Sequence, residues 1–458
     1  MNRFSQYIRP GTRGHLIGIG GVSMSPLAEV LSGMGLSIQG SDIRDGDNIE
    51  HLREKQIRVL IGHRAENIGN DTDFIIRTAA VHDDNPEVAE ARRRGIPVFE
   101  RTEAWGAIMQ DYKNAVCISG THGKTTTTSM MTHILMAAQK DPTVMIGGTL
   151  PLLHAGHRVG EGDTIVMESC EYCNSFLNFY PTIAVILDID ADHLDFFKDI
   201  EDIKRSFREF ASHVPEDGHI IVNLDDANTM DAISPLGREL MTFGLSESAD
   251  VYAKNIRQLG VHTDFDVFYR GKRFTHVTLH VPGIHNVYNA LAASAAAICL
   301  NIRPVAVEYG LGAFHGAGRR FEFKGKYNGA DVYDDYAHHP GELKALLDAT
   351  EGLGYKRRIV VFQPHTYSRT KALFADFVEQ LRRPDMTILA EIYAAREQNT
   401  IGISSRDMVP QIPNSMYFDS FDKILTALQW TASPGDLILT VGAGDIYKLG
   451  EQLVEKNP

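Results

Sequence analysis

Seven consecutive residues, Gly-Thr-His-Gly-Lys-Thr-Thr at positions 120–126, are typical of a loop that binds nucleotide phosphates. They follow a strand-like apolar run, and glycines there let backbone N–H groups point at phosphate from a helix N-terminus. The pattern departs from the usual P-loop at Ile118, where a glycine is expected, and a threonine-rich helix cap is the alternative. We predict an ATP-binding loop formed by Gly120, Thr121, His122, Gly123, Lys124, Thr125 and Thr126.

Glu168 and His193 each follow an apolar strand-like run. Open α/β sheets bind ligands where their strands end, and a hard cation that bridges phosphates needs oxygen ligands there. Taken singly, each residue is equally well explained as a polar surface residue. Together with the Thr125 hydroxyl, they predict a Mg²⁺ site beside the phosphates, in which Lys124 supplies the positive charge.

A second glycine loop lies near the amino terminus, at Gly18, Gly20 and Gly21. It approximates the dinucleotide fingerprint, but Ser23 stands where the third glycine belongs, and Asp42 is the candidate acidic partner. The loop predicts a diphosphate under a helix N-terminus without selecting NAD. A tight strand–helix turn that binds no ligand is the alternative.

The carboxy-terminal third carries polar groups just after its expected strands. Four of them have metal-ligating side chains, namely Asp334, Asp335, His338 and His339. Three arginines, Arg319, Arg320 and Arg369, are suited instead to bidentate binding of phosphate or carboxylate. Because no further metal-binding companion is present, we favour substrate binding for this group.

Two smaller patterns remain. Asn286 and Asn289 open an otherwise apolar helix, where N-capping explains one of them and base recognition explains both. Cys170 and Cys173 have the spacing of a zinc or redox pair, but no second pair exists. We expect inert thiols near the nucleotide, with a four-cysteine zinc site as the alternative.

The elements that must position these residues alternate between strand and helix along the whole chain. Nearly continuous apolar strands predict parallel sheets covered on both faces, and residues 249–281 alternate in polarity like an antiparallel insertion. Expected strands include residues 15–18, 74–77, 116–119, 165–168, 183–188, 359–362 and 437–441. Expected helices include residues 25–34, 125–138, 204–213 and 286–300.

Length and composition limit the possible classes. The 458 residues suggest about three domains, and a net charge of −14 argues against nucleic-acid binding. No apolar run is long enough to span a membrane, and the amino terminus lacks the apolar core of a signal peptide. We expect a cytoplasmic protein without nucleic-acid or membrane partners, as a monomer or weak homodimer.

With these motifs the chain resembles the Mur ligases, ADP-forming amide ligases that build the peptide stem of the peptidoglycan precursor. The similarity covers nearly the whole length and is carried by "GTHGKTT", "HNVYNA", "DDYAHHP" and "QPHTYSRT". It implies a Rossmann-like domain at 1–111 for the UDP end of the substrate. It further implies a central P-loop-type ATPase domain at 112–315. A Rossmann-like domain for the amino acid would follow at 316–458.

The resemblance also implies roles for individual residues. Lys124, Glu168 and His193 would be catalytic, the last two as metal ligands. The UDP-sugar would contact Gly18, Gly20, Gly21, Ser23, Ser41 and Asp42. The adenine would lie near His285, Asn286 and Asn289. The reacting end of the substrate and the amino acid would contact Arg319, Arg320, Tyr336, His338 and Arg369.

His122 indicates the first ligase of the series, because later ligases usually carry asparagine there. That enzyme uses ATP and Mg²⁺ to join L-alanine to the lactyl carboxylate of UDP-N-acetylmuramate through an acyl phosphate. A recycling ligase that attaches a murein tripeptide to the same sugar is the alternative. Outside the class, an NAD-dependent oxidoreductase would explain only the first glycine loop. A non-catalytic regulator is suggested by Cys170 and Cys173, which replace two aspartates of the family's "EADESDASFL".

Overall fold

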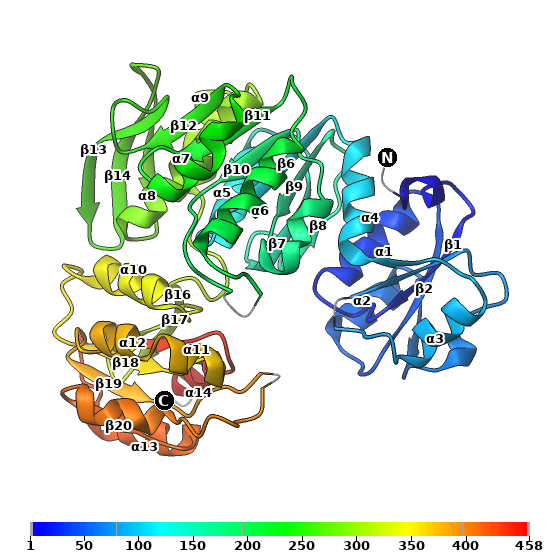
Figure 1. The fold of residues 1–458 in the computed structure, drawn as a ribbon. Helices are drawn as coiled ribbons and strands as arrows, with labels where there is room; N and C mark the ends of the chain where they lie inside the picture. Colours follow the sequence, from blue (N-terminus) through cyan, green and yellow to red (C-terminus); the bar gives the residue numbers. More distant parts are fainter. Residues whose placement is uncertain (1–2, 79, 194–195, 396, 456–458) are drawn as a thin grey trace. The chain divides into compact units, whose positions relative to one another are not determined.

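The computed structural model describes residues 3–78, 80–193, 196–395 and 397–455. These residues form three sheets, of five, ten and six strands (Figure 1). Their contacts divide the chain into two compact units. The first unit is Met1–Lys254, Asp266–Thr275 and Tyr288–Leu311, and the second is Asn255–Phe265, His276–Val287 and Gly312–Pro458. Among the described residues, every helix is too short or too polar to cross a bilayer.

The first sheet is parallel and has the strand order β3-β2-β1-β4-β5. Its strands are β1 (Arg13–Ile17), β2 (Ser37–Asp42), β3 (Arg58–Ile61), β4 (Phe74–Arg77) and β5 (Val98–Glu100). Alternate residues of β4 face opposite sides, because side chains alternate along a strand. Phe74 and Ile76 belong to one core with α1 (Met24–Gly33) and α4 (Arg101–Ile108), whereas Ile75 packs with α3 (Pro86–Arg93).

The second sheet has the order β15-β14-β13-β12-β11-β10-β6-β9-β7-β8. Its first seven strands along the chain are β6 (Asn114–Ser119), β7 (Thr143–Leu150), β8 (Ala155–Arg158), β9 (Thr164–Glu168), β10 (Ile183–Ile186), β11 (His219–Asn223) and β12 (Leu240–Gly244). The last three are β13 (Val251–Leu259), β14 (His262–Tyr269) and β15 (Lys272–Leu279). Two-residue turns join these three strands, which only antiparallel neighbours allow. The predicted antiparallel insertion is therefore confirmed.

The third sheet has the order β16-β17-β21-β18-β19-β20. Its strands are β16 (Glu322–Tyr327), β17 (Ala330–Asp335), β18 (Arg358–Phe362), β19 (Met386–Leu389), β20 (Ser415–Tyr417) and β21 (Leu437–Val441). Val360 and Phe362 share a core with α10 (Pro340–Thr350) and α12 (Phe374–Leu381). Ile359 and Val361 face the opposite core, with α13 (Phe421–Thr431) and α14 (Tyr447–Glu455).

The predicted α/β class, with parallel sheets covered on both faces, is confirmed. Most expected elements occur within a few residues of their predicted ends; the helix after the phosphate loop is α5 (Lys124–Ala137), and α8 spans Ile284–Cys299. The strand expected at 183–188 is shorter, because β10 ends at Ile186 and the chain then turns to contact the phosphate loop. The domain boundaries at 111/112 and 315/316 stay predictions.

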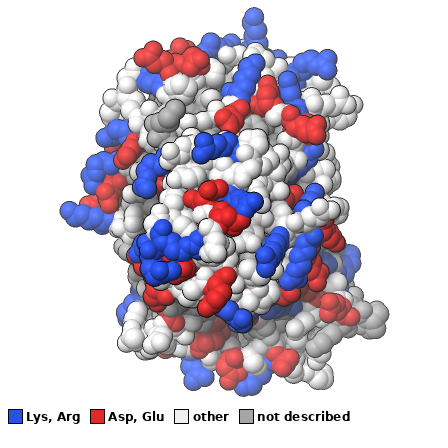
Figure 2. Space-filling view, turned by 90° about the vertical axis from the view of Figure 1, so that its right-hand side faces the viewer, with Lys and Arg blue, Asp and Glu red and all other residues white. Residues whose placement is uncertain are grey.

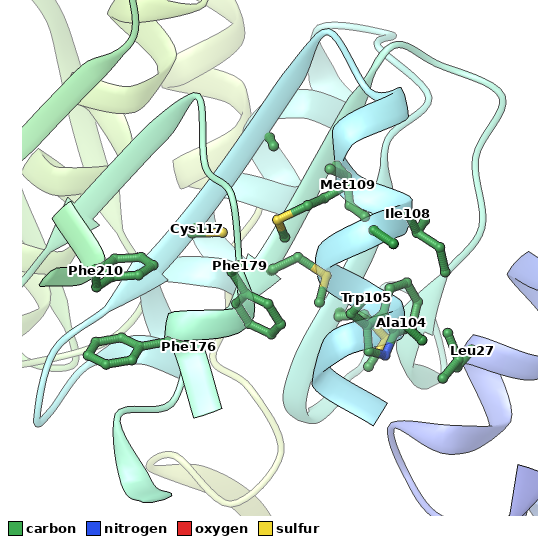
Figure 3. Packing of buried hydrophobic residues seen from close by; sticks show 14 of the residues in the cluster. Leu27, Ala104, Trp105, Ile108, Met109, Cys117, Phe176, Phe179 and Phe210 are labelled. Carbon is green, nitrogen blue, oxygen red and sulfur yellow. The ribbon is translucent and has the colours of Figure 1, made fainter. Parts of the chain in front are cut away.

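One continuous core in the first unit joins α1 and α4 to the second sheet and to α6 (Ile200–Ser212) (Figure 3). Phe176 and Phe210 stack with ring centroids 4.6 Å apart, and Phe207 meets Phe176 edge-on at 5.1 Å. Trp105 of α4 is 1% exposed and donates a hydrogen bond from its indole N–H to the carbonyl of Ser23. The loop that precedes α1 is thereby tied to the buried end of α4.

Acidic and basic side chains are interspersed over the face of the molecule shown in Figure 2. The one dense basic run of the sequence, residues 92–94, is paired locally. Arg92 contacts Asp83 at 2.8 Å, Arg93 contacts Glu90 at 2.7 Å, and Arg94 donates to two backbone carbonyls. These contacts agree with a solvated helix face.

Replacing Phe210 with alanine should lower the free energy of unfolding of the first unit by about 3–5 kcal/mol, because a buried ring is lost and a cavity remains. Denaturant titration can follow the fluorescence of Trp105, since Trp430 is 88% exposed and changes little on unfolding. Tyr309→Ala is the control: this side chain is 71% exposed, and a change within about 0.5 kcal/mol is expected. Equal effects of the two variants would contradict the role given to this core.

Candidate nucleotide and substrate site

The phosphate loop connects β6 to α5 and depends on two glycines with positive φ, Gly120 at +143° and Gly123 at +79°. A Cβ at Gly123 would lie 2.5 Å from Oδ1 of Asn289. The same oxygen accepts a hydrogen bond of 3.2 Å from the Thr127 hydroxyl. Asn289 of α8 therefore packs directly against the loop, and only glycine at 123 leaves room for it.

Asp188, just beyond β10, holds the loop from the other side. Its Oδ1 accepts the His122 N–H at 2.8 Å, and its backbone carbonyl accepts the Thr121 N–H at 3.1 Å. Burial raises the pKa of this carboxyl to about 6, although His122 and Lys124 act in the opposite direction. Asp188 was not among the predicted site residues, and its only signal in the sequence is its position at the end of an apolar strand.

Lys124 is folded back over the loop. Its Nζ donates to the carbonyls of Gly120 at 2.5 Å and Thr121 at 3.0 Å, and to Oε2 of Glu171 at 3.0 Å. Burial alone would lower the pKa of Lys124, but the Glu171 carboxylate outweighs it and raises the pKa. The ammonium is therefore firmly charged and lies where phosphates would meet the loop.

Carboxylates surround the head of α5. The Thr125 hydroxyl donates to Oε1 of Glu168 at 2.9 Å, and Oε2 of Glu168 accepts the Gly147 N–H at 2.5 Å. His193 Nε2 lies 3.6 Å from Oε1 of Glu171, the carboxylate that also binds Lys124. The structure thus brings Thr125, Glu168 and His193 to one end of the sheet, with Glu171 as the link that the predicted site lacked.

This donor set fits a hard divalent cation, because it offers two carboxylates and a hydroxyl with one imidazole beside them. Glu171 is 2% exposed, and without a bound cation its buried charge has Lys124 as its main partner. The sequence carried a signal for it, since "ESCEYC" keeps both glutamates while the family's aspartates are replaced.

The first glycine loop turns at Gly18, with φ +78°, and the N–H of Gly20 donates to Oδ2 of Asp42 at 2.9 Å. A cavity of about 280 Å³ opens beside this contact. It is lined by Gly20, Asp42, Arg44, Asp45, Gly46, Asp47, Asn48 and Ile49. Ser41 is fully buried instead: its hydroxyl donates to Glu87 at 2.5 Å and lies 2.9 Å from His63 Nδ1.

A second cavity of about 310 Å³ is lined by Gly21 and Ser23 of the same loop. It extends past Arg101 to Glu168 and Cys170. Among the described residues, no carboxylate lies within ion-pair distance of the Arg101 guanidinium, and burial lowers its pKa. A partly buried guanidinium that makes no ion pair and lines a cavity is suited to an anionic ligand. Arg101 was not predicted, and its sequence signal is limited to its place after a short strand.

In the second unit, aromatic and imidazole rings gather at the ends of β17 and β18. His338 lies 5.3 Å from Tyr336 and 5.9 Å from His365, and His365 stacks on Tyr393 at 5.7 Å, all between ring centroids. Burial, His338 and Arg369 together lower the pKa of His365 to about 4, which keeps this ring neutral. The predicted residues His338 and Arg369 thus lie near His365, and Tyr336 lies beside His338. The sequence contained His365 within "QPHTYSRT", but we did not select it.

Arg319 and Arg320, two of the three predicted arginines of this unit, have different surroundings. Arg319 donates to the buried Asp334 at 3.1 Å and to the Gly442 carbonyl at 2.5 Å, so its guanidinium supports the fold. Arg320 lies 3.6 Å from Glu342 and 5.2 Å from the Tyr336 ring, next to the ring cluster. Arg319 lies over the same Tyr336 ring at 4.9 Å, so the two arginines differ in that Asp334 and the Gly442 carbonyl hold the Arg319 guanidinium.

His285 and Asn286 also belong to the second unit. Burial lowers the pKa of His285 to about 4. In the first turn of α8, the side-chain amide of Asn286 donates a hydrogen bond of 2.7 Å to the Pro282 carbonyl. Their position near adenine stays a prediction. All four cysteines are free thiols, with Cys117 buried in β6 and Cys170 and Cys173 exposed, which favours inert thiols over a four-cysteine site.

A phosphate loop with carboxylates at neighbouring strand ends, beside a second glycine loop with two cavities, defines a nucleotide-dependent enzyme of the α/β class. Three family models match the chain: "Mur ligase family, catalytic domain" at residues 13–113, "Mur ligase middle domain" at 118–297, and "Mur ligase, glutamate ligase domain" at 319–444. The chain belongs to the Mur ligase family.

Individual relatives agree over nearly the full length. A UDP-N-acetylmuramate–L-alanine ligase from Caldanaerobacter subterraneus subsp. tengcongensis is 47% identical over 449 residues, covering 97% of each chain. Its counterpart from Agathobacter rectalis is 46% identical, covering 96% of this chain and 97% of the relative. The crystal structure of the UDP-N-acetylmuramate–alanine ligase from Thermotoga maritima matches with a TM-score of 0.80 at 27% identity, covering 97% of this chain and 98% of that one.

Asp188→Ala should raise the KM for ATP roughly tenfold, because the buried N–H of His122 loses its acceptor at a cost of about 1–3 kcal/mol. Asp188→Asn retains an oxygen acceptor, so its KM should stay close to that of the wild type. Initial-rate kinetics with varied ATP measures both values. Equal behaviour of the two variants would show that the charge, and not the hydrogen bond, shapes the loop.

The stability of the Asp188→Asn variant relative to the wild type should depend on pH. A raised pKa means that the ionised Asp188 opposes folding; this cost is absent below pH of about 4 and complete above about 6. Asp188→Asn removes the charge, so its stability relative to the wild type should increase as pH rises from 4 to 7. Denaturant titrations at several pH values test this, and a pH-independent difference would contradict it.

Proposed function

We propose that this chain is an ATP-dependent ligase that joins L-alanine to the lactyl carboxylate of UDP-N-acetylmuramate in peptidoglycan synthesis, releasing ADP and phosphate. The observation that carries the proposal is the phosphate loop with its ring of carboxylates, in a chain 47% identical over nearly its full length to an enzyme of that name. ATP is the nucleotide that the Gly-Lys-Thr loop supports.

The two cavities of the first unit support a path for the sugar nucleotide. The glycine loop separates them, with Gly20 lining one and Gly21 the other. In our proposal the nucleoside occupies the cavity beside Asp42 and the diphosphate crosses the loop. The sugar then fills the cavity that ends at Glu168, so that its lactyl carboxylate approaches the γ-phosphate held at Lys124.

The reaction needs two substitutions. A lactyl carboxylate oxygen attacks the γ-phosphorus, the bond from that phosphorus to the β–γ bridging oxygen breaks, and ADP leaves. The amine nitrogen of alanine, after losing a proton, then attacks the acyl carbon, whose bond to the phosphate oxygen breaks. The first step depends mainly on positioning and charge neutralisation, which the loop N–H groups and Lys124 provide.

We propose that Mg²⁺ is held by Thr125, Glu168 and His193, with Glu171 beside them. When bound, it would neutralise phosphate charge and orient the γ-phosphate. With the cation beside Glu171, the carboxylate would interact less strongly with Lys124, and the Lys124 ammonium could bind the phosphates. In the second unit we assign the binding of alanine to Tyr336, His338, His365 and Arg369, where the guanidinium suits the amino-acid carboxylate. We expect a monomer or weak homodimer acting in the cytoplasm.

The first experiment supplies ATP, Mg²⁺ and UDP-N-acetylmuramate with either free L-alanine or a murein tripeptide, and measures phosphate release. We expect release with free alanine and its loss, by a factor of about a thousand or more, in Lys124→Ala, because that charge stabilises the transferring phosphoryl group. Lys448→Ala, on the exposed side of α14, is the matched control. Release with the tripeptide alone would instead establish the recycling ligase.

Arg101→Gln should raise the KM for UDP-N-acetylmuramate roughly 10–100-fold, since hydrogen bonds to a charged group contribute about 1.5–3 kcal/mol, while the KM for ATP changes little. Calorimetry with UDP-N-acetylglucosamine, which lacks the lactyl carboxylate, locates the contact. Weakened binding of both sugars assigns Arg101 to the diphosphate, and weakened binding of the muramate alone assigns it to the carboxylate. Unchanged binding of both would remove Arg101 from the site.

A further inference from the structure

Three metal-ligating side chains that the ligase reaction does not use meet in the first unit. Glu29 lies on α1, His51 on α2 (Asp47–Glu54) and His157 on the edge strand β8. Their ligand atoms all lie within 4.8 Å of one another. Both imidazoles direct Nε2 at the same carboxylate oxygen, Oε1 of Glu29, at 2.6 Å from His51 and 3.4 Å from His157.

We propose that Glu29, His51 and His157 form a binding site for a zinc-class divalent cation, distinct from the Mg²⁺ site of the ligase reaction. Two imidazoles and one carboxylate are a common three-residue set for zinc, with water as the fourth ligand. In a tetrahedral site with bonds of about 2.0–2.1 Å, ligand atoms are roughly 3.3 Å apart. The observed separations of 2.6 and 3.4 Å lie on either side of that value, so small side-chain rotations suffice.

The surroundings are compatible with binding. The side chains of Glu29 and His157 are 13% and 14% exposed, whereas His51 is 42% exposed and leaves an entry path. A bound cation would replace the two hydrogen bonds that the imidazole Nε2 atoms make with Oε1 of Glu29. Lys55 lies 3.7 Å from Oε2 of Glu29, but its side chain is 54% exposed and free to move into water.

Such an ion would connect elements that the chain separates. Glu29 lies in the middle of α1, the helix that follows the glycine loop, and His51 lies one turn after Asn48, which lines the 280 Å³ cavity. His157 belongs to the ten-stranded sheet. Coordination would therefore cross-link both walls of the UDP-substrate region to β8, and we expect it to stabilise the first unit.

The test uses full-length, metal-free protein titrated with Co²⁺, whose visible absorption reports tetrahedral coordination, and with Zn²⁺ by calorimetry. His51→Gln and His157→Gln should each bind one equivalent fewer than the wild type. His154→Gln, an exposed histidine three residues from His157, is the matched control and should bind like the wild type. Binding at the cysteines or the Mg²⁺ site is common to all variants and cancels in the comparison.

Stability supplies the second measurement. Zn²⁺ should raise the thermal unfolding midpoint of the wild type and of His154→Gln, and should raise it less in His157→Gln, because a ligand that binds only the folded state stabilises it. Ligase activity without added zinc should be similar in all three proteins and shows that the variants fold. Equal stoichiometry and equal midpoint shifts in all variants would overturn the site and leave a hydrogen-bonded Glu–His pair network.

Discussion

The phosphate loop keeps its shape because three side chains outside it hold it in place. Asp188 fixes the backbone of His122, Asn289 packs against Gly123, and Glu171 holds the Lys124 ammonium over the loop. Each comes from a different element, so the loop forms only when the central sheet and α8 are assembled. A loop whose N–H groups are already oriented loses little conformational entropy when phosphate binds. The same fixed orientation lets these dipoles stabilise the charge of the transferring phosphoryl group without reorganising.

The same dependence on neighbours extends to the substrate end. The continuous core around Trp105 and Phe179 holds α4 against the second sheet (Figure 3). The hydrogen bond from the Trp105 indole to the Ser23 carbonyl also holds the glycine loop in place. Because that loop borders both cavities, the two ends of a sugar nucleotide are positioned by one packed interface. Buried apolar contacts thus position the loop between the two cavities, the second of which Glu168 also lines.

The sequence predicted the class of fold and the two glycine loops because strand periodicity and loop composition are local signals. It placed Thr125 and Glu168 together because carboxyl ends of parallel strands meet at one edge. It did not reveal Arg101, whose importance depends on a cavity formed by residues far apart in the chain. It also predicted ligand contacts for Ser41 and Arg319, whose side chains in the structure contact Glu87 of α3 and Asp334 of β17.

The two replaced aspartates show how chemistry can persist when a motif changes. A carboxylate at position 170 would lie near Arg101 and Lys124 and would neutralise part of their charge. Here position 170 carries a thiol whose side chain reaches solvent, yet desolvation by the surrounding protein and the nearby Glu171 carboxylate raise its pKa to about 11, so it is neutral at physiological pH. Among the described residues, the Glu100 carboxylate interacts with the positive charge of Arg101, but no carboxylate forms an ion pair with it, which leaves the guanidinium suited to an anionic ligand. Because Glu168 and Glu171 remain, the change alters the electrostatics of substrate binding and leaves the cation-binding carboxylates in place.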